Sequence, residues 1–336
     1  MTKIALLTSG GDAPGMNAAI RAIVHSCQHH QYECIGFFHG YNGLLNDEWQ
    51  ALTHADVGNI LQFGGTILKS ARCPAMCDPK GPKQAANTLR KHQIDALIVI
   101  GGDGSFRGLE ALKAHWEGQV IGLPGTIDND LAGSDNTIGF ATAVTTATHA
   151  IDKIRDTANA FERVFIVEVM GRHSGHIAFN VGLATGAEAI LSFENCDPAD
   201  TAPQLARLIS QIQVQQQHNH DSFVIVLAEN LWPGGPQALK AQLAEQAGID
   251  SAVCVLGHIQ RGGSPAPEDR LLATELGLEA VNAVSRNQDR IMIGKQGSTL
   301  QAVPLNGAIN DAKPVNGRWV AAHEDVLTEY LIKHSE

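Results

Sequence analysis

The chain has 336 residues and a formal net charge of −11, with a sequence pI near 5.7. Because 24 Lys and Arg face 35 Asp and Glu, we do not expect an extended nucleic-acid-binding surface. This length favours two domains or one large α/β domain. Residues 1–7, MTKIALL, run directly into a strand pattern, and no apolar run is long enough to span a bilayer. We therefore expect a cytoplasmic protein with neither a secretory signal nor a membrane segment.

The first element predicted is a strand over residues 3–8, followed by a glycine-containing turn over residues 9–17, SGGDAPGMN, and a helix over 18–28. A strand, a glycine-rich turn and a helix N-terminus form a geometry that binds phosphate. One such turn is more often ordinary turn structure. The pattern recurs after residues 100 and 123, and this repetition favours phosphate binding.

The next segment predicts a strand near residues 33–38 and a helix over 82–92. Between them, residues 64–72, GGTILKSAR, carry two cations beside a glycine pair, and this pattern fits a phosphate-binding loop or a solvated loop equally well. The alternation of strands and helices is typical of a doubly wound parallel sheet.

Six cysteines are present, at Cys27, Cys34, Cys73, Cys77, Cys196 and Cys254. They lack the spacing of a disulfide framework, so we expect reduced thiols. Cys73 and Cys77 resemble half of a metal site, but no matching pair follows at zinc-ribbon spacing. Two unrelated loop thiols are the favoured interpretation.

The centre of the chain holds two apolar strands, over residues 96–100 and 120–123, each followed by a glycine-rich polar loop. These loops place Asp103, Asp128 and Asp130 just beyond the carboxyl ends of the strands, where open parallel sheets bind ligands. Carboxylates there can hold Mg²⁺ or accept a proton. The pattern predicts a phosphoryl-transfer centre.

The second half predicts a helix from residue 139 to about 156 and a polar helix end over 211–220. Strands are expected over residues 165–170, 222–228 and 252–256, each ending in polar residues. The chain therefore predicts two α/β lobes whose facing strand ends form a cleft.

Five motifs resemble the bacterial ATP-dependent 6-phosphofructokinases in content, order and spacing: residues 7–21, 100–105, 124–130, 167–172 and 257–265. The resemblance covers essentially the full length. It implies two Rossmann-like three-layer α/β/α lobes in a homotetramer with sites shared across subunits, using ATP and Mg²⁺. The ATP-binding lobe would comprise residues 1–139 plus about 260–310, and the sugar-phosphate lobe 140–259 plus about 311–336.

The resemblance also implies roles for individual residues. Asp128 would be the general base for the sugar 1-hydroxyl, and Asp103 with Asp130 would position Mg²⁺. Charge on the transferring group would be stabilised by Gly11, Arg72, Arg172 and Thr126. The nucleotide-binding residues would be Gly11, Tyr41, Arg72, Cys73, Gly102, Asp103, Gly104 and Ser105. The residues that contact the acceptor sugar would be Thr126, Asp128, Asp130, Met170, Gly171, Arg172 and Glu229. The 6-phosphate of the sugar would be bound by His258 and Arg261, and Arg163 would reach the site of a neighbouring subunit.

The phosphoryl donor is inferred from two glycines. Pyrophosphate-using relatives carry Asp at the position of Gly104 and Lys at that of Gly125, and those side chains would occupy the room of the α-phosphate. Glycine at both positions favours ATP.

The chain departs from the family at the acceptor and nucleotide sites. Ala252 stands where the familiar enzymes have a second trans-subunit arginine. Loss of a charged hydrogen bond, worth roughly 1.5–3 kcal/mol, would weaken fructose 6-phosphate binding by roughly ten- to a hundredfold. Lys69 adds a charge near the ATP phosphates. Cys73 and Cys77 replace an aromatic residue and an arginine around the adenosine, which leaves the nucleotide selectivity open.

The effector site differs as well. Arg21, Arg155 and Glu188 match the family, whereas four histidines stand where other members carry Arg or Lys, at His25, His54, His218 and His220. Because histidine is mostly neutral above its pKa of about 6.5, activation by ADP and inhibition by phosphoenolpyruvate are expected to be weak near pH 8 and stronger toward pH 6. Alternatively, these histidines have no role.

Three other functions are weighed against the kinase. A related acceptor such as sedoheptulose 7-phosphate is prompted by Ala252. A non-catalytic regulatory paralogue would not need the candidate base Asp128. A dinucleotide-dependent dehydrogenase is disfavoured because the first turn lacks G-x-G-x-x-G.

Overall fold

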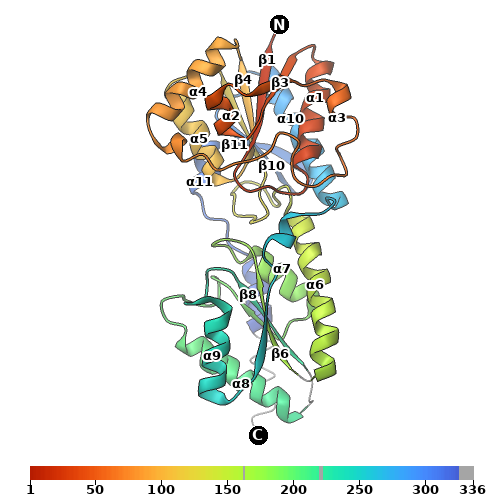
Figure 1. Cartoon of the computed structure of the whole chain (residues 1–336), viewed down its shortest axis with the longest axis vertical. Helices are drawn as coiled ribbons and strands as arrows, with labels where there is room; N and C mark the ends of the chain where they lie inside the picture. The colour runs from red at the N-terminus through yellow and green to blue at the C-terminus, as the bar shows by residue number, and fades with distance from the viewer. Residues whose placement is uncertain (162, 219–221, 325–336) are drawn as a thin grey trace. The chain divides into compact units, whose positions relative to one another are not determined.

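The computed structural model describes residues 1–161, 163–218 and 222–324, and the chain divides into two units (Figure 1). Unit 1 comprises Met1–Ile127, Leu131–Thr142 and Arg261–Lys313, and unit 2 comprises Asp128–Asp130, Ala143–Gln260 and the chain from Pro314 onward. The predicted lobes differ from these units mainly in two short segments. Residues 128–130 belong to unit 2, and residues 140–142 belong to unit 1.

Unit 1 is built on a seven-stranded sheet of order β11-β10-β5-β4-β1-β2-β3. The neighbouring strands from β10 to β2 are parallel, whereas the edge strands β3 and β11 are antiparallel to their neighbours. Figure 1 shows α1 and α10 on one face and α4, α5 and α11 on the other. The elements are β1 (Lys3–Ser9), α1 (Met16–His29), β2 (Glu33–Phe37), α2 (Tyr41–Asn46), β3 (Trp49–Ala51), α3 (His54–Val57), η1 (Pro74–Cys77), α4 (Lys80–Lys91), β4 (Ala96–Gly101), α5 (Asp103–Lys113), β5 (Gln119–Pro124), α10 (Pro267–Ser285), β10 (Ile291–Gln296), β11 (Thr299–Pro304) and α11 (Leu305–Asn310).

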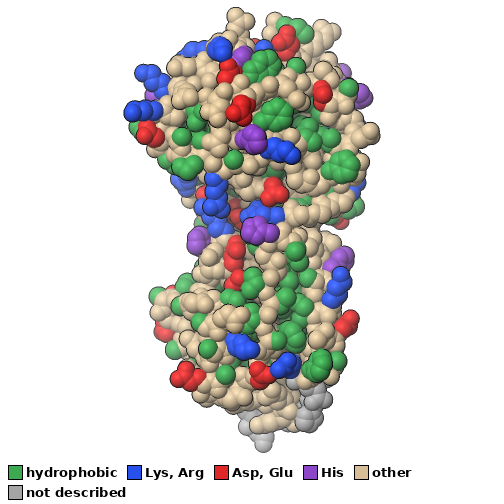
Figure 2. Space-filling view, in the orientation of Figure 1, with side chains coloured by type: hydrophobic (Ala, Val, Ile, Leu, Met, Phe, Trp, Pro, Cys, Tyr) green, Lys and Arg blue, Asp and Glu red, His purple; other side chains and the backbone are tan. Residues whose placement is uncertain are grey.

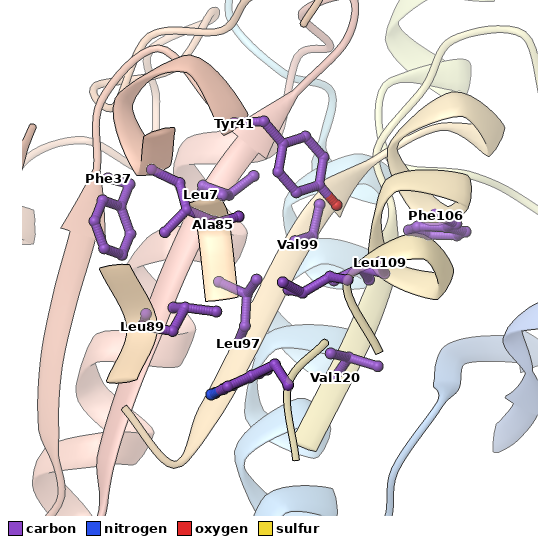
Figure 3. Close-up of a cluster of buried hydrophobic side chains, with 14 of the residues drawn as sticks. Leu7, Phe37, Tyr41, Ala85, Leu89, Leu97, Val99, Phe106, Leu109 and Val120 are labelled. Atoms are coloured by element: carbon purple, nitrogen blue, oxygen red, sulfur yellow. The ribbon is translucent and has the colours of Figure 1, made fainter. Parts of the chain in front are cut away.

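The central strands of unit 1 are apolar along their whole length because helices cover both faces of the sheet. Every residue of β4 is buried. Leu7, Leu97 and Val99 from the strands pack with Leu89 and Leu109 from the helices (Figure 3). This core fixes the strands on which the candidate site is built.

The register of the central strands brings their carboxyl ends to the same level. Ser9 at the end of β1 pairs with Gly101 at the end of β4, and Gly101 pairs with Pro124 at the end of β5. The three predicted glycine turns therefore follow one edge of the sheet.

Unit 2 is built on a four-stranded parallel sheet of order β7-β8-β6-β9. Figure 1 shows α6 and α9 on opposite faces of this sheet. The elements are α6 (Phe140–Phe161), whose first turn belongs to unit 1, β6 (Val164–Val169), α7 (His176–Thr185), β7 (Ala189–Leu191), α8 (Ala202–His218), β8 (Phe223–Ala228), α9 (Gly235–Ala247), β9 (Ser251–Val255) and η2 (Gly257–Arg261). The helix predicted from residue 139 to about 156 corresponds to α6, and its predicted end is wrong because α6 continues to Phe161.

The predicted α/β class with parallel sheets is confirmed.

On the face shown in Figure 2, acidic and basic side chains are interspersed. Among the helices that the structure describes, none has both the length and the apolar character needed to cross a membrane.

Candidate active site

The turn between β1 and α1 is closed by an arginine from a distant part of unit 1. A Cβ atom at Gly11 would lie 2.6 Å from Arg261 Nη1, and the same nitrogen donates to Asp12 O at 3.0 Å. A side chain at this position would displace the guanidinium group of Arg261. Helix α1 begins further along the turn, at Met16, and the order of strand, glycine turn and helix N-terminus is one that binds phosphate.

The loop that carries Arg72 is held against α1 by a buried amide. Asn17 is 2% exposed. Its Nδ2 donates to Phe63 O at 3.1 Å and its Oδ1 accepts from Ile67 N at 2.8 Å. Arg72, further along the loop, is exposed. The amide therefore fixes the start of the loop while leaving its guanidinium end accessible.

Two hydroxyls tie the same loop to the β1–α1 turn. Thr8 Oγ1 donates to Lys69 O, and Ser70 Oγ donates to Gly10 O, each at 2.8 Å. Lys69 itself adopts a φ of 60°, a left-handed conformation that costs free energy in a non-glycine residue. These bonds stabilise that conformation and position the cationic loop beside the turn.

The β4 and β5 loops of unit 1 lie together at the sheet edge. Asp103 is half-buried and is the first residue of α5. A Cβ atom at Gly102 would lie 3.7 Å from Thr126 Cβ, whereas one at Gly104 would meet no atom of the described residues within 4 Å. Thr126 is buried, and its carbonyl accepts from Thr137 Oγ1 at 2.5 Å. One half-buried carboxylate, that of Asp103, therefore lies at this end of the sheet.

Tyr41 supports this edge from within the core. It is 2% exposed, and its hydroxyl donates to Ser105 O at 2.7 Å. Burial, with a smaller contribution from Cys73, raises the pKa of Tyr41 well above its ordinary value. The ring of Tyr41 is part of the hydrophobic core (Figure 3), and its assignment as a nucleotide contact stays a prediction.

The two cysteines of the candidate nucleotide site differ in exposure. Cys73 is half-buried and Cys77 is exposed. Burial is the largest cause that raises the pKa of the Cys73 thiol. The raised pKa favours the protonated form of this thiol, and Cys73 is free of any disulfide, as the sequence predicts.

The candidate base lies in the segment of the β5–α6 connection that belongs to unit 2. Asp128 is 7% exposed, and its carbonyl accepts from Ser174 Oγ at 2.7 Å. The next residue, Asn129, has a φ of 53°, and Asp130 is half-buried. Ser174 was not singled out from the sequence, since a serine in a polar loop carries no distinctive pattern.

The loop after β6 is organised by a carboxylate from the end of β8. Glu229 Oε1 accepts from Gly171 N at 3.1 Å and from Arg172 N at 2.7 Å. Arg172 has a φ of 59°, and its carbonyl accepts from Asn230 Nδ2 at 3.0 Å. Asn230 was not predicted to contribute. Glu229 holds the backbone of this loop in addition to any ligand contact.

The buried Gln260 and the half-buried Glu168 were also missed. Gln260 is fully buried and its Oε1 accepts from Met170 N at 3.2 Å. Burial first, and then the charge of Glu229, raise the pKa of Glu168. The sequence signal for Glu168 is the presence of a glutamate within the otherwise apolar strand β6.

The residues assigned to the sugar 6-phosphate divide between the units. His258 is exposed in unit 2, whereas Arg261 lies in unit 1 beside Gly11. Arg163 Nη2 donates to Asp250 Oδ2 at 2.7 Å, and this bond is the main cause that lowers the pKa of Asp250. Ala252 lies on β9 opposite Phe165.

The effector candidates form two groups, one in each unit. In unit 1, the Nδ1 atoms of His25 and His54 lie 3.1 Å apart, and burial, Arg21 and His54 lower the pKa of His25. In unit 2, Arg155 Nη1 donates to Glu188 Oε1 at 2.8 Å. The side chain of His218 and the whole of His220 lie outside the described residues.

The predicted site and effector residues are divided between the two units. Unit 1 holds Gly11, Arg21, His25, Tyr41, His54, Arg72, Cys73, Gly102, Asp103, Gly104, Ser105, Thr126 and Arg261. Unit 2 holds Asp128, Asp130, Arg155, Arg163, Met170, Gly171, Arg172, Glu188, Glu229 and His258.

Comparison with known proteins gives one family. The profile of the phosphofructokinase family matches residues 3–284. A relative from Thermus thermophilus, ATP-dependent 6-phosphofructokinase 1, is 46% identical over 94% of this chain and 96% of its own length. The ATP-dependent 6-phosphofructokinase of Coxiella burnetii is 45% identical over 97% of this chain and 96% of its own.

Solved structures agree. The phosphofructokinase of Saccharomyces cerevisiae superposes with a TM-score of 0.84 at 33% identity, covering 99% of this chain. The present chain spans about half of that yeast chain, 48%. A pyrophosphate-dependent phosphofructokinase from Marinobacter aquaeolei shares the fold, with a TM-score of 0.83 at 19% identity. The chain belongs to the phosphofructokinase family.

Proposed function

We propose that the chain is an ATP-dependent 6-phosphofructokinase, which transfers the γ-phosphoryl group of ATP to O1 of fructose 6-phosphate and gives fructose 1,6-bisphosphate. The observation that carries the proposal is the common sheet edge of β1, β4 and β5, with its glycine turns and Asp103. The names of relatives at 45–46% identity support both the donor and the acceptor.

In this proposal Asp128 accepts the proton of the 1-hydroxyl while the sugar oxygen attacks the γ-phosphorus and ADP leaves. The N–H of Gly11 and the guanidinium groups of Arg72 and Arg172 stabilise charge on the transferring group, together with Thr126. In-line transfer needs positioning and electrostatic stabilisation rather than a covalent enzyme intermediate. The bonds from Asn17, Thr8 and Ser70 to the loop of Arg72 support that positioning.

We assign Asp103 and Asp130 to Mg²⁺, which prefers oxygen ligands. Asp103 fits this role because it is a half-buried carboxylate that directly follows the carboxyl end of β4 and begins α5. When bound, Mg²⁺ would neutralise charge on the β and γ oxygens of the nucleotide.

On the acceptor side, Met170, Gly171 and Glu229 are assigned to the sugar hydroxyls, and His258 with Arg261 to the 6-phosphate. Arg163 is assigned to the 6-phosphate bound in a neighbouring subunit. This assignment requires an oligomer, and we propose a homotetramer. We also propose that the enzyme acts in glycolysis in the cytoplasm. Ala252 supplies no cation, so a high KM for fructose 6-phosphate is expected.

The proposal is tested by steady-state kinetics of the purified chain with Mg²⁺. Either ATP or pyrophosphate is the donor, and either fructose 6-phosphate or sedoheptulose 7-phosphate is the acceptor. The kinase assignment requires turnover with ATP and the highest kcat/KM for fructose 6-phosphate. A higher kcat/KM for the seven-carbon sugar would reassign the acceptor. Nucleotide binding without turnover on either sugar would favour a regulatory paralogue.

The donor preference predicts the behaviour of Gly104→Asp. A side chain at Gly104 projects into open space, whereas Gly125 is also required by packing, since a Cβ there would lie 2.7 Å from Ile100 Cγ2. We expect the new carboxylate to lower kcat/KM for ATP roughly ten- to a hundredfold, because like charges about 4 Å apart repel by roughly 1–4 kcal/mol. Gly104→Asn is the uncharged control. Unchanged ATP kinetics in Gly104→Asp would contradict this assignment of the donor site.

We also propose that the histidines of the effector region make regulation pH-dependent. Activation by ADP and inhibition by phosphoenolpyruvate are expected to grow from pH 8 toward pH 6. Because burial, Arg21 and His54 lower the pKa of His25, the contribution of His25 should appear last, at the acid end of this range and below it. Initial rates with and without each effector, measured in EDTA-treated protein with excess Mg²⁺, test this. A flat response over that range would contradict it.

A further inference from the structure

Two histidines from different helices of unit 1 meet edge to edge. His25 lies on α1, and His54 is the first residue of α3. Their Nδ1 atoms are 3.1 Å apart, and their ring centroids are 4.5 Å apart with an interplanar angle of 78°. His25 is half-buried, whereas His54 is exposed. The pair is therefore both fixed and accessible.

The position of His54 is defined by its own helix start. Asp56 Oδ2 accepts from Thr53 N at 2.8 Å and from Thr53 Oγ1 at 2.6 Å. Bonds between the residue before a helix and the third residue of that helix fix its first turn. The approach of His54 to His25 thus follows from two anchored elements, and neither side chain extends from a long loop.

We propose that His25 and His54 bind one divalent transition-metal ion, with Zn²⁺ as the reference ion, through their Nδ1 atoms. Zn–N bonds are about 2.0–2.1 Å long, so nitrogens 3.1 Å apart subtend an angle of roughly 100° at the metal. That angle lies between the octahedral and the tetrahedral value. The bridge requires no movement that would separate the helices.

The proton balance is simple. Without metal, one Nδ1–H donates to the other Nδ1. With metal, both imidazoles remain neutral, and the proton moves to the Nε2 of its own ring. Each Nδ1 lone pair then points to the ion. Water completes the coordination on the exposed side of His54.

The chemistry of the pair selects the ion. Imidazole suits Zn²⁺, Cu²⁺ and Ni²⁺, whereas Mg²⁺ prefers oxygen ligands, so the Mg²⁺ of a kinase assay does not compete. In the part of the chain that the structure describes, no group of three or more His, Cys, Asp and Glu is arranged to hold a metal. The site is thus a two-ligand site, weaker than a four-ligand structural zinc site. The charge of Arg21, which lies near His25, weakens it further.

The proposal is tested by isothermal titration of the full chain with ZnCl₂ in the presence of Mg²⁺, using the wild type, His25→Gln and His54→Gln. His29→Gln is the matched control, because His29 is an exposed histidine of α1 outside the pair. We expect one Zn²⁺ equivalent in the wild type and in the control. Either variant of the pair should bind that equivalent at least tenfold more weakly. Only the folded chain holds both ligands together. Zn²⁺ should therefore also raise the Tm of the wild type and of the control, but not the Tm of His25→Gln or His54→Gln.

A spectroscopic measurement covers the case in which a variant folds poorly. Electron paramagnetic resonance of the wild type with one equivalent of Cu²⁺ should show coupling to two imidazole nitrogens. The folded His54→Gln chain, altered at an exposed position, should show one. Equal zinc affinity in the wild type and in His54→Gln, or copper coupling that does not change between them, would overturn the proposal.

Discussion

Replacement of Asp128 by asparagine is expected to lower the rate of phosphoryl transfer by roughly two to four orders of magnitude, the usual contribution of a positioned general base. The amide has the shape of the carboxylate but cannot accept the hydroxyl proton at neutral pH. The KM values for ATP and fructose 6-phosphate should change little, since the substitution removes an interaction that matters in the transition state. The measurement is kcat together with the single-turnover rate, because product release can limit kcat.

The matched control is Asp135→Asn. Asp135 lies on the same β5–α6 connection, but it is exposed, and its Oδ2 accepts from Gly297 N at 2.6 Å. It has no part in the proposed chemistry, so its single-turnover rate should stay within about twofold of the wild type. If Asp128→Asn retained a single-turnover rate within tenfold of the wild type, another group would have to accept the proton.

The elements around the candidate site that the sequence predicted well are local in the chain. The glycine turns after β1, β4 and β5 directly follow apolar strands, so strand, turn and carboxylate are read together within about ten residues. Asp103 is an example, because it is both the residue after a glycine pair and the first residue of α5. Because helices cover both faces of the sheet, these strands have continuous apolar sequences instead of alternating apolar and polar residues, and a continuous apolar run predicts a buried strand.

The hairpin of β10 and β11 was not predicted, although a signal was present. Gln296 pairs with Thr299, so the loop consists of Gly297 and Ser298, and Gly297 has a φ of 57°. A two-residue loop that begins with glycine is typical of a hairpin. The strand β11 is largely exposed, so its weak apolar pattern concealed the turn.

Other contributors could not have been predicted, because their partners are remote in sequence. Gln260 contacts Met170, and Arg261 contacts Asp12. Nothing near either residue in the chain indicates these bonds. The same holds for Asp269, which accepts from residues that precede it by more than a hundred positions.

Asp269 supplies the cap that helix α6 cannot provide for itself. The residue before the helix is Gly139, with a φ of +103°, and a Cβ there would lie 2.7 Å from Ala13 Cβ. Asp269 is 1% exposed. Its Oδ1 accepts from Gly139 N at 2.8 Å, and its Oδ2 accepts from Thr142 N at 2.7 Å and Thr142 Oγ1 at 2.5 Å. Both atoms therefore satisfy donors of the first helical turn.

The same burial makes this carboxylate sensitive to pH. Desolvation is the largest effect on Asp269 and raises its pKa, although the bonds from Thr142 and Gly139 oppose that rise. Between the unfolded and the folded pKa, the folded chain binds more protons than the unfolded chain. The contribution of Asp269 to stability is therefore fully present below the unfolded pKa and declines as the pH rises through the folded pKa.

Asp269→Ala is expected to lower the free energy of unfolding by about 3 kcal/mol, because it removes a helix cap and leaves buried backbone donors unsatisfied. For a chain unit of this size the Tm should fall by roughly 6–12 °C. Asp269→Asn keeps one acceptor oxygen and should lose less than the alanine variant. Its stability should also lack the decline with rising pH that is specific to the carboxylate.

Thermal unfolding followed by circular dichroism between pH 4 and pH 8 measures both effects, with Glu268→Ala as the exposed neighbour on α10 that should change the Tm little. A Tm for Asp269→Ala within 2 °C of the wild type would show that the first turn of α6 is stable without this cap. Equal pH profiles for the wild type and Asp269→Asn would show that the carboxylate does not titrate in that range. Because α6 begins in unit 1 and continues into unit 2, loss of the cap should also raise the rate of amide exchange at Gly139 and Thr142 before global unfolding.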